Sequence, residues 1–170
     1  MRAPGLLVVL VASAAVAQEP SLELRKLLTT IDSPPTKAQL VERQGRDTAM
    51  ALRALASSTR EPLGLRRAAL AALGYFDEPA TRAVLSRLAQ DPQPLVRKAA
   101  LETLGFLLAG AKDGVLLQAL GDEDPMVRRA ALRSLGASRD VEVRAALARR
   151  LAVETDVETR AVLEQALARP

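Results

Sequence analysis

A ten-residue stretch that returns at a fixed interval limits what this chain can fold into. The stretch from Leu65 to Gly74 reads LRRAALAALG, and closely similar stretches begin at Val96 and Val127. The interval from the first copy to the second equals that from the second to the third. Self-similarity with a period of ~20–50 residues is typical of repeat arrays, in which each unit packs on its neighbours. The sequence therefore predicts a repeat protein.

The repeated stretch has the pattern of a helix with one buried side. Val96, Ala100, Leu101 and Leu104 recur about once per helical turn. Aromatic residues make up only 2% of the chain, so the core must consist of Leu, Val and Ala, of which Leu and Ala are among the best helix formers. The predicted fold class is all-α, an α-solenoid of about four to five helical hairpins with a period of about 31 residues.

Capping residues suggest where the helices begin and end. Asp124-Pro125 places a capping side chain and a first-turn proline at one helix start, and Asp47 is expected to cap another. Gly74, Gly105 and Gly136 fall at or just past expected helix ends, where a left-handed residue is commonly needed. The expected helix pairs within the array, residues 47–170, are 47–58 with 65–74, 79–90 with 94–108, 112–120 with 125–135, and 142–153 with 158–169.

Residues 1–17 have the pattern of a secretory signal peptide. Arg2 is followed by an apolar run from Leu6 to Ala17, which ends in the small-residue cleavage site Ala15-Val16-Ala17. This run is shorter than the ~20 residues that span a bilayer. We expect cleavage after Ala17, no stable membrane insertion, and a periplasmic or secreted protein. A buried N-terminal helix and an uncleaved anchor are the less favoured alternatives.

Residues 18–46 are less regular. Apolar residues from Leu22 to Ile31 predict a short helix that stops before Pro34-Pro35, and a second short helix is expected from Thr36 to Gln44. Terminal repeats are usually atypical. We therefore expect a helical segment that serves as a degenerate capping repeat, with a flexible leader as the alternative.

An acidic residue precedes an arginine by six positions in three successive repeats. The pairs are Asp91 and Arg97, Asp122 and Arg128, and Glu154 and Arg160. An acid in a turn and an arginine at the start of the next helix are expected to form a ladder of charge-assisted hydrogen bonds between adjacent repeats. Arg60 stands in the acid's place before Arg66. We therefore expect a weaker ladder where the N-terminal segment joins.

These motifs resemble the HEAT-repeat family, in particular short bacterial repeats similar to those of phycobilisome bilin lyases. The resemblance rests on the stretches DPQPLVRKAA at 91–100 and DEDPMVRRAA at 122–131, and it covers residues 47–170. It implies a helical repeat fold and, for most members, a scaffold for protein interaction. A minority of members are enzymes, among them bilin lyases, a His-rich di-iron hydroxylase and a DNA glycosylase.

Charged residues recur in register on the second helices, which usually line the concave face of such arrays. They are Arg67, Lys98 and Arg129, with Glu102 and Arg133 one turn beyond the last two. We interpret them as a face that binds a protein partner, with Arg129 and Arg133 holding an acidic segment by bidentate contacts. The alternative is a solvated face that only keeps the array soluble.

Two aromatic residues, Tyr75 and Phe106, are also separated by one repeat period. We expect them to fill the seams between repeats, with a small exposed platform at the repeat edge as the alternative. Phe76 and Leu107 are expected to pack in a similar way.

Missing residue types exclude much chemistry. The chain has no Cys and no His, so disulfides, thiolate metal sites and the commonest general base are absent. No phosphate-binding glycine loop or calcium loop is present. We therefore predict no catalytic, metal-binding or cofactor-binding residues, and a protein that is not an enzyme.

Taken together, the sequence predicts an exported scaffold that acts as a monomer and binds a periplasmic or envelope protein. The net charge of +4 is small and interspersed, and stacking aromatics are few, which argues against nucleic acid as a ligand. The alternatives are an enzyme-like or cofactor-binding protein resembling bilin lyases, which the export signal disfavours, and a purely structural envelope spacer.

Overall fold

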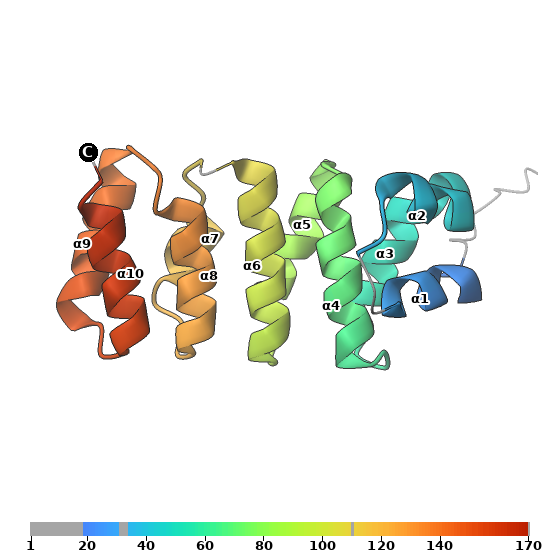
Figure 1. The fold of residues 1–170 in the computed structure, drawn as a ribbon, viewed down its shortest axis with the longest axis horizontal. Helices are drawn as coiled ribbons and strands as arrows, with labels where there is room; N and C mark the ends of the chain where they lie inside the picture. Colours follow the sequence, from blue (N-terminus) through green and yellow to red (C-terminus); the bar gives the residue numbers. More distant parts are fainter. Residues whose placement is uncertain (1–18, 31–33, 110, 170) are drawn as a thin grey trace, which may run out of the picture.

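The chain forms a row of helices in two layers (Figure 1). The computed structural model describes residues 19–30, 34–109 and 111–169, and every regular element in those ranges is helical. The predicted signal peptide lies outside the described residues.

Four repeats of a first and a second helix make up most of the array. The first helices are α3 (Thr48–Ser57), α5 (Pro79–Leu88), α7 (Gly114–Ala119) and α9 (Val141–Val153). The second helices are α4 (Leu63–Ala72), α6 (Pro94–Leu108), α8 (Pro125–Leu135) and α10 (Val157–Leu167). Successive second helices pack on one another and form one layer, with the first helices behind them (Figure 1). The predicted α-solenoid of helical hairpins is confirmed.

Leucines on the second helices join the repeats. Leu70, Leu101 and Leu132 occupy the same position in successive repeats and are fully buried, each facing the interior between neighbouring helices. Burying a leucine side chain contributes about 1.5–3 kcal/mol, so the repeated position is a main source of nearest-neighbour stability.

An N-terminal hairpin closes one end of the row. It consists of α1 (Leu22–Thr29) and α2 (Lys37–Gln44), followed by a 3-10 turn, Gly45–Asp47. Leu24, Leu28 and Leu40 are buried in the same core as α3 and α4. Helix α1 packs on α4, and α2 packs on α3. In this hairpin the first helix therefore joins the layer of second helices and the second helix joins the layer of first helices, the reverse of the regular repeats. Helices α1 and α2 of the N-terminal segment thus pack on the array.

The recurring glycines have a different role from the one expected. Gly105 lies inside α6, and Gly136 ends α8 with a right-handed φ of −65°. The left-handed helix ends predicted at these positions are wrong. A Cβ built on Gly105 would stand 1.8 Å from the hydroxyl oxygen and 2.4 Å from the Cβ of Ser134. Gly105 is therefore needed because α8 approaches α6 too closely for any side chain.

The two predicted capping aspartates have different outcomes. Asp124 accepts a hydrogen bond from the Met126 N–H at 2.7 Å, as an N-cap should. Asp47 precedes α3 but its side chain caps nothing, contrary to expectation. The 3-10 turn before α3 explains this, because it leaves the Asp47 backbone near helical angles instead of the extended conformation of a cap.

Candidate functional site

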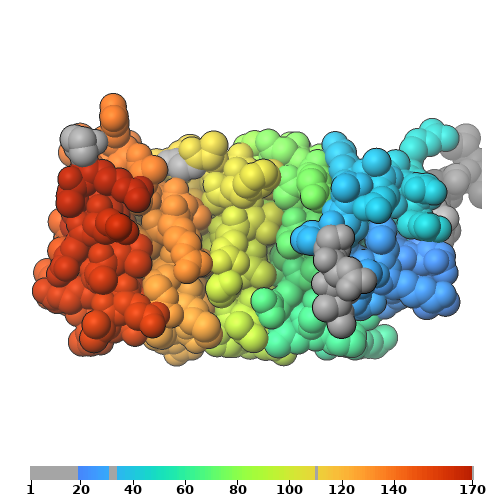
Figure 2. All heavy atoms as spheres, viewed as in Figure 1, coloured from blue at the N-terminus to red at the C-terminus, as the bar shows by residue number. Residues whose placement is uncertain are grey.

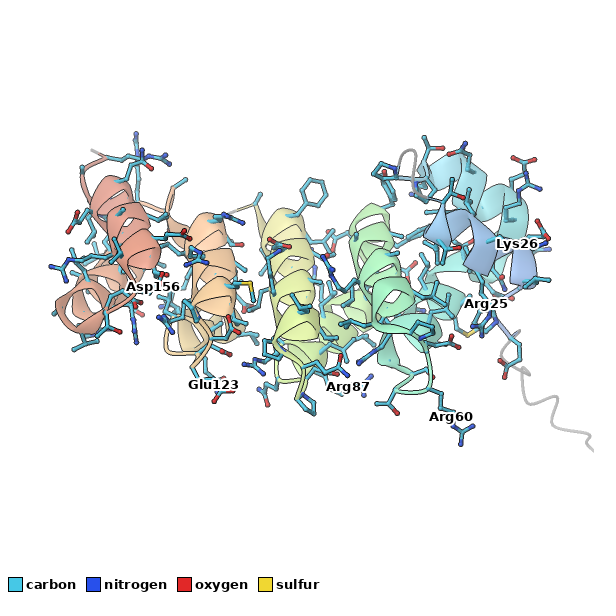
Figure 3. All side chains as sticks on the ribbon, turned by 60° about the horizontal axis from the view of Figure 1, so that its bottom comes forward. Arg25, Lys26, Arg60, Arg87, Glu123 and Asp156 are labelled. Atoms are coloured by element: carbon cyan, nitrogen blue, oxygen red, sulfur yellow. The ribbon has the colours of Figure 1, made fainter. Side chains whose placement is uncertain are left out.

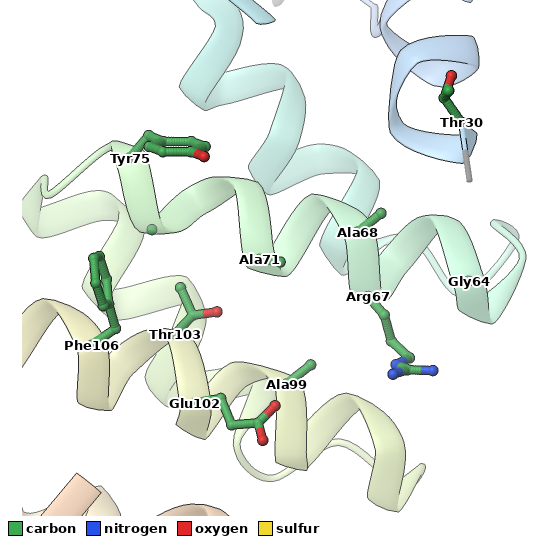
Figure 4. Close-up of a pocket in the computed structure, with 11 residues that line it drawn as sticks. Thr30, Gly64, Arg67, Ala68, Ala71, Tyr75, Ala99, Glu102, Thr103 and Phe106 are labelled. Carbon is green, nitrogen blue, oxygen red and sulfur yellow. The ribbon is translucent and has the colours of Figure 1, made fainter. Parts of the chain in front are cut away.

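Helices α4, α6, α8 and α10 form one surface, here called the second-helix face (Figure 2). A groove runs between α4 and α6 on this face. Its volume is ≈ 940 Å³. Most of its floor consists of small residues. The lining residues are Thr30, Gly64, Arg67, Ala68, Ala71, Gly74, Tyr75, Ala99, Glu102, Thr103 and Phe106 (Figure 4).

Two aromatic side chains lie at one end of this groove (Figure 4). Phe106 is 73% exposed and Tyr75 is 44% exposed. The expectation that both fill seams between repeats is wrong. Phe76 occupies the interior instead and is buried in the core, as expected for that residue, and this places the neighbouring Tyr75 outside.

The ring of Phe106 reaches across from α6 toward α4. A Cβ built on Gly74 would stand 3.5 Å from Phe106 Cδ1. Leu107, the next residue, is partly buried and packs on the core. Since neighbouring residues of a helix point in different directions, burial of Leu107 accompanies exposure of Phe106.

The other half of the groove is charged. Arg67 is exposed and forms no ion pair with the described residues. On α6, the Glu102 carboxylate forms ion pairs with Lys98 at 2.9 Å and with Arg133 of α8 at 3.5 Å. The structure thus brings four of the five predicted face residues into one region.

Arg129 is the exception among the predicted face residues. Its guanidinium pairs with Asp156 at 2.7 Å and with Glu158 at 3.4 Å. Hydrogen bonds from the Thr159 hydroxyl and N–H, together with the charge of Arg129, lower the pKa of the Asp156 carboxyl. Arg129 therefore joins α8 to the start of α10, and the expected bidentate contact of Arg129 with a partner, which stays a prediction, would compete with these ion pairs.

The acid and arginine positions form hydrogen bonds that cross from one repeat to the next. Arg97 donates to both carboxylate oxygens of Asp122, at 2.9 and 2.8 Å, and Arg128 donates to both of Glu154, at 2.8 and 2.6 Å. These partners lie 25 and 26 residues apart in the chain. The six-residue partners meet only through the main chain: Arg97 bonds the Asp91 carbonyl at 3.1 Å.

The ladder extends further toward the N-terminus than expected. Arg66 is 2% exposed and donates to Asp91 at 2.6 Å and to the Ala56 carbonyl at 3.0 Å. The predicted weak point at Arg66 is wrong, because its carboxylate comes from the following repeat and not from the position that Arg60 fills. The regular spacing of Arg66, Arg97 and Arg128 in the sequence was the signal that could have identified Arg66 as a member of the ladder.

The two ends of the ladder differ from its middle. At the N-terminal junction, Arg25 of α1 pairs with Glu61 at 2.7 Å. At the other end, Arg160 is exposed, bonds the Glu154 carbonyl at 3.4 Å and pairs with Glu164 of its own helix at 3.3 Å. In α8, the residue four positions after Arg128 is the buried Leu132. In α10, the residue four positions after Arg160 is Glu164. The last described helix is therefore charged where earlier ones are apolar.

The Glu154 carboxylate of the ladder has a strongly lowered pKa. Its burial opposes ionisation, but hydrogen bonds from Arg128, Arg150 and the Asp156 N–H outweigh burial and lower the pKa to about 2. Such a shift in a cleft often marks a catalytic group. Here Glu154 is fully buried between arginines, so the shift reflects a structural ion pair.

Charges elsewhere on the surface are mixed in sign. Arg60 and Glu123 extend outward from turns, away from the groove (Figure 3). Within the described ranges, no group of His, Cys, Asp and Glu residues is arranged to hold a metal ion. The same part of the chain contains no helix with the length and apolarity needed to cross a membrane.

Comparison with known proteins gives a family for the chain. A family model described as HEAT repeats matches residues 48–115 and again residues 114–168. No curated protein and no solved structure matched the chain. The two matches span all four regular repeats, from α3 to α10, and they agree with the 31-residue period and the two-layer arrangement. The chain belongs to the HEAT-repeat family.

Proposed function

We propose that this protein is an exported, monomeric scaffold without catalytic activity that binds a protein partner on its second-helix face. The binding site is the groove between α4 and α6. HEAT repeats are a fold of the protein-interaction scaffold kind, which is the general support for this proposal.

The observation that carries the proposal is the exposure of two aromatic side chains at a groove. Phe106 is 73% exposed and Tyr75 is 44% exposed at the end of a groove of ≈ 940 Å³. Aromatic side chains placed in water at a concave surface gain about 25 cal/mol per Å² when a partner covers them. Tyr and Phe are also enriched in interface cores, and Tyr is enriched among the residues that dominate binding energy.

The rigidity of the array supports the same function. The leucine seams and the ladder fix α4 and α6 before any partner arrives. Little conformational entropy is then lost at the protein's side of the interface, so more of the contact energy becomes affinity.

Export is supported by residues 1–17, whose pattern of Arg2, an apolar run and Ala15-Val16-Ala17 is that of a cleaved signal. The expected mature protein begins at Gln18. Intact-mass measurement of the protein recovered from the envelope or medium tests this point, and a retained N-terminus in the cytoplasm would contradict it.

The binding proposal is tested by crosslinked capture from the envelope fraction. The variant is Phe106→Ser, and the control is Val141→Ser, because Val141 is an apolar residue of the opposite helix layer that is even more exposed, at 81% against 73% for Phe106. Both variants should keep the helical circular dichroism of the parent. We expect one protein to be captured by the parent and by V141S but lost with F106S.

Two other outcomes contradict the proposal in different ways. Equal capture by all three proteins would move the binding site away from the α4–α6 groove. No capture by any of them would argue against a binding function and favour a structural spacer of the envelope.

A further inference from the structure

The α4–α6 groove has a chemical polarity that specifies the kind of segment it fits. One end presents the rings of Tyr75 and Phe106, and the other presents the guanidinium of Arg67 (Figure 4). Between them the floor carries the apolar side chains of Ala68 and Ala71. We infer that the groove takes an amphipathic helix of the partner protein, with an acidic side chain and a large apolar side chain seven or eight residues apart. This inference rests on the proposed function.

Charge complementarity identifies the acidic side chain. Lys98 and Arg133 share one carboxylate, that of Glu102, which lines the groove together with Arg67. Arg67 is exposed and has no ion-pair partner among the described residues. A carboxylate from the partner supplies the missing charge, and the planar guanidinium can bind it through two parallel hydrogen bonds.

The distance between the two ends sets the spacing. Arg67 and Tyr75 are eight residues apart on α4 and the 3-10 turn that follows it, which corresponds to about 13 Å along the axis. A partner helix rises about 1.5 Å per residue. At that rise, about 13 Å is spanned by between eight and nine residues, and the nearest spacings that place both anchors on the same face of a helix are seven and eight residues.

The alanines of the floor favour a helix over an extended segment. An extended backbone would turn N–H and C=O groups toward these methyl groups, and each unpaired group costs about 1–3 kcal/mol. The Thr103 hydroxyl has no proton left for a partner carbonyl, since it donates to the Leu70 carbonyl at 3.1 Å. A helix satisfies its backbone internally and presents only side chains to the groove.

The test uses synthetic helical peptides of about 15 residues, held helical by side-chain lactams because unconstrained peptides of this length are marginal helices. The acidic probe carries Glu and Phe seven residues apart. A basic probe replaces that Glu with Lys, and a broken probe carries a central proline. Binding to the mature chain is measured by fluorescence anisotropy with the parent, Arg67→Glu, and the control Arg60→Glu. Arg60 also has no ion pair with the described residues, but it extends away from the groove (Figure 3).

We expect the acidic probe to bind the parent and R60E equally, and R67E on the order of tenfold more weakly. The basic probe should regain affinity for R67E, which a general loss of folding would not allow. Three results would each overturn the inference. The acidic and basic probes could bind the parent equally, or the broken probe could bind the parent as tightly as the acidic probe. The acidic probe could also show no saturable binding at millimolar concentration.

These failures are separable from failure of the proposed function. If an envelope protein is captured in an F106S-sensitive way but the acidic probe does not bind, the groove is a binding site for a segment of different chemistry. If capture is insensitive to F106S, the proposed site itself is wrong, whatever the peptides do.

Discussion

Two seams between second helices, α4–α6 and α6–α8, derive from the same repeated sequence but differ in how closely the helices approach. At α6–α8, Gly105 faces Ser134 so closely that no Cβ fits. At α4–α6, a Cβ on Gly74 would make an ordinary contact of 3.5 Å with Phe106. The hollow between α6 and α8 is ≈ 530 Å³, against ≈ 940 Å³ for the groove between α4 and α6. The residue nearest to the recurring glycine is thus Ser134 at the close seam and Phe106 at the seam with the wider groove.

The buried ion pairs that join the repeats at the two seams also differ. Arg97 makes two bonds to Asp122 at the close seam, while Arg66 makes one to Asp91 at the open seam. Arg66 is nonetheless the more buried arginine. The comparison shows that the turns stay joined by buried charge even where the helices separate, so a groove can open without loss of the connection between repeats.

The largest effect is expected from removing the ladder carboxylates. Asp91→Ala leaves the buried Arg66 with only the Ala56 carbonyl, and loss of one partner of a buried ion pair costs about 3–5 kcal/mol. Asp122→Ala should cost less, because Arg97 keeps bonds to two carbonyls and a contact with Glu123. Urea unfolding of the two variants measures the difference. A larger loss for D122A would show that the open seam depends less on its ladder than its burial indicates.

A third seam, α8–α10, extends the comparison to pH. Glu154 has a pKa lowered from 4.5 to about 2 in the folded protein. Its contribution to stability is therefore complete above about pH 4.5 and is lost as the pH falls through 2. The full loss amounts to about 3 kcal/mol at ~1.4 kcal/mol per unit.

The measurement is the urea midpoint of the parent and of Glu154→Gln between pH 6 and pH 2.5. We expect E154Q to be less stable than the parent at pH 6, with the difference shrinking as the pH falls. A constant difference across this range would mean that the carboxylate does not act through its charge.

A smaller effect is expected from filling the close approach of α6 and α8. Gly105→Ala should destabilise by about 1–3 kcal/mol, because the helices must separate to make room for the methyl group. Gly74→Ala, at the open seam, should change stability by less than about 0.5 kcal/mol. Thermal unfolding of both variants compares the two seams directly.

A second substitution separates crowding from other causes. Ser134→Gly removes the atoms nearest to the new methyl group and leaves the Ser134 Cα at 3.5 Å. In the double variant G105A/S134G, the crowding cost of G105A should largely disappear, and the roughly 0.5 kcal/mol of helix propensity lost at 134 is offset by the roughly 1 kcal/mol gained at 105. If the two substitutions are additive, the close approach is not what requires glycine at 105.

The sequence was sufficient to predict the architecture because the 31-residue period appears in both apolar and charged positions. Leu70, Leu101 and Leu132 recur with that period, and the buried leucine seam follows from it. The acid and arginine positions were likewise visible. Their pairing was not, because sequence spacing cannot distinguish a contact with the preceding turn from one with the turn of the following repeat.

The groove was less accessible to sequence reasoning. Tyr75 and Phe76 are adjacent, and only the 3-10 turn at the end of α4 decides which ring enters the core. Three face residues, Arg67, Lys98 and Arg129, occupy equivalent repeat positions. Among them, Arg129 alone forms an ion pair with a residue of the following repeat, Asp156, within the described part of the chain. Equivalent positions in a repeat array receive different neighbours wherever the adjoining repeat differs, and such differences create a site.

The smallest effect is expected at the aromatic end of the open seam. Phe106→Ala should leave the free energy of unfolding within about 0.5 kcal/mol of the parent, because substitutions of largely exposed residues rarely exceed this. Phe76→Ala, one repeat earlier and buried, should cost about 3–5 kcal/mol. Thermal unfolding of the two variants under identical conditions gives the comparison. A cost for F106A approaching that of F76A would mean that the ring over Gly74 holds α4 and α6 together, so its exposure would reflect packing of the seam and not a surface kept open for a partner.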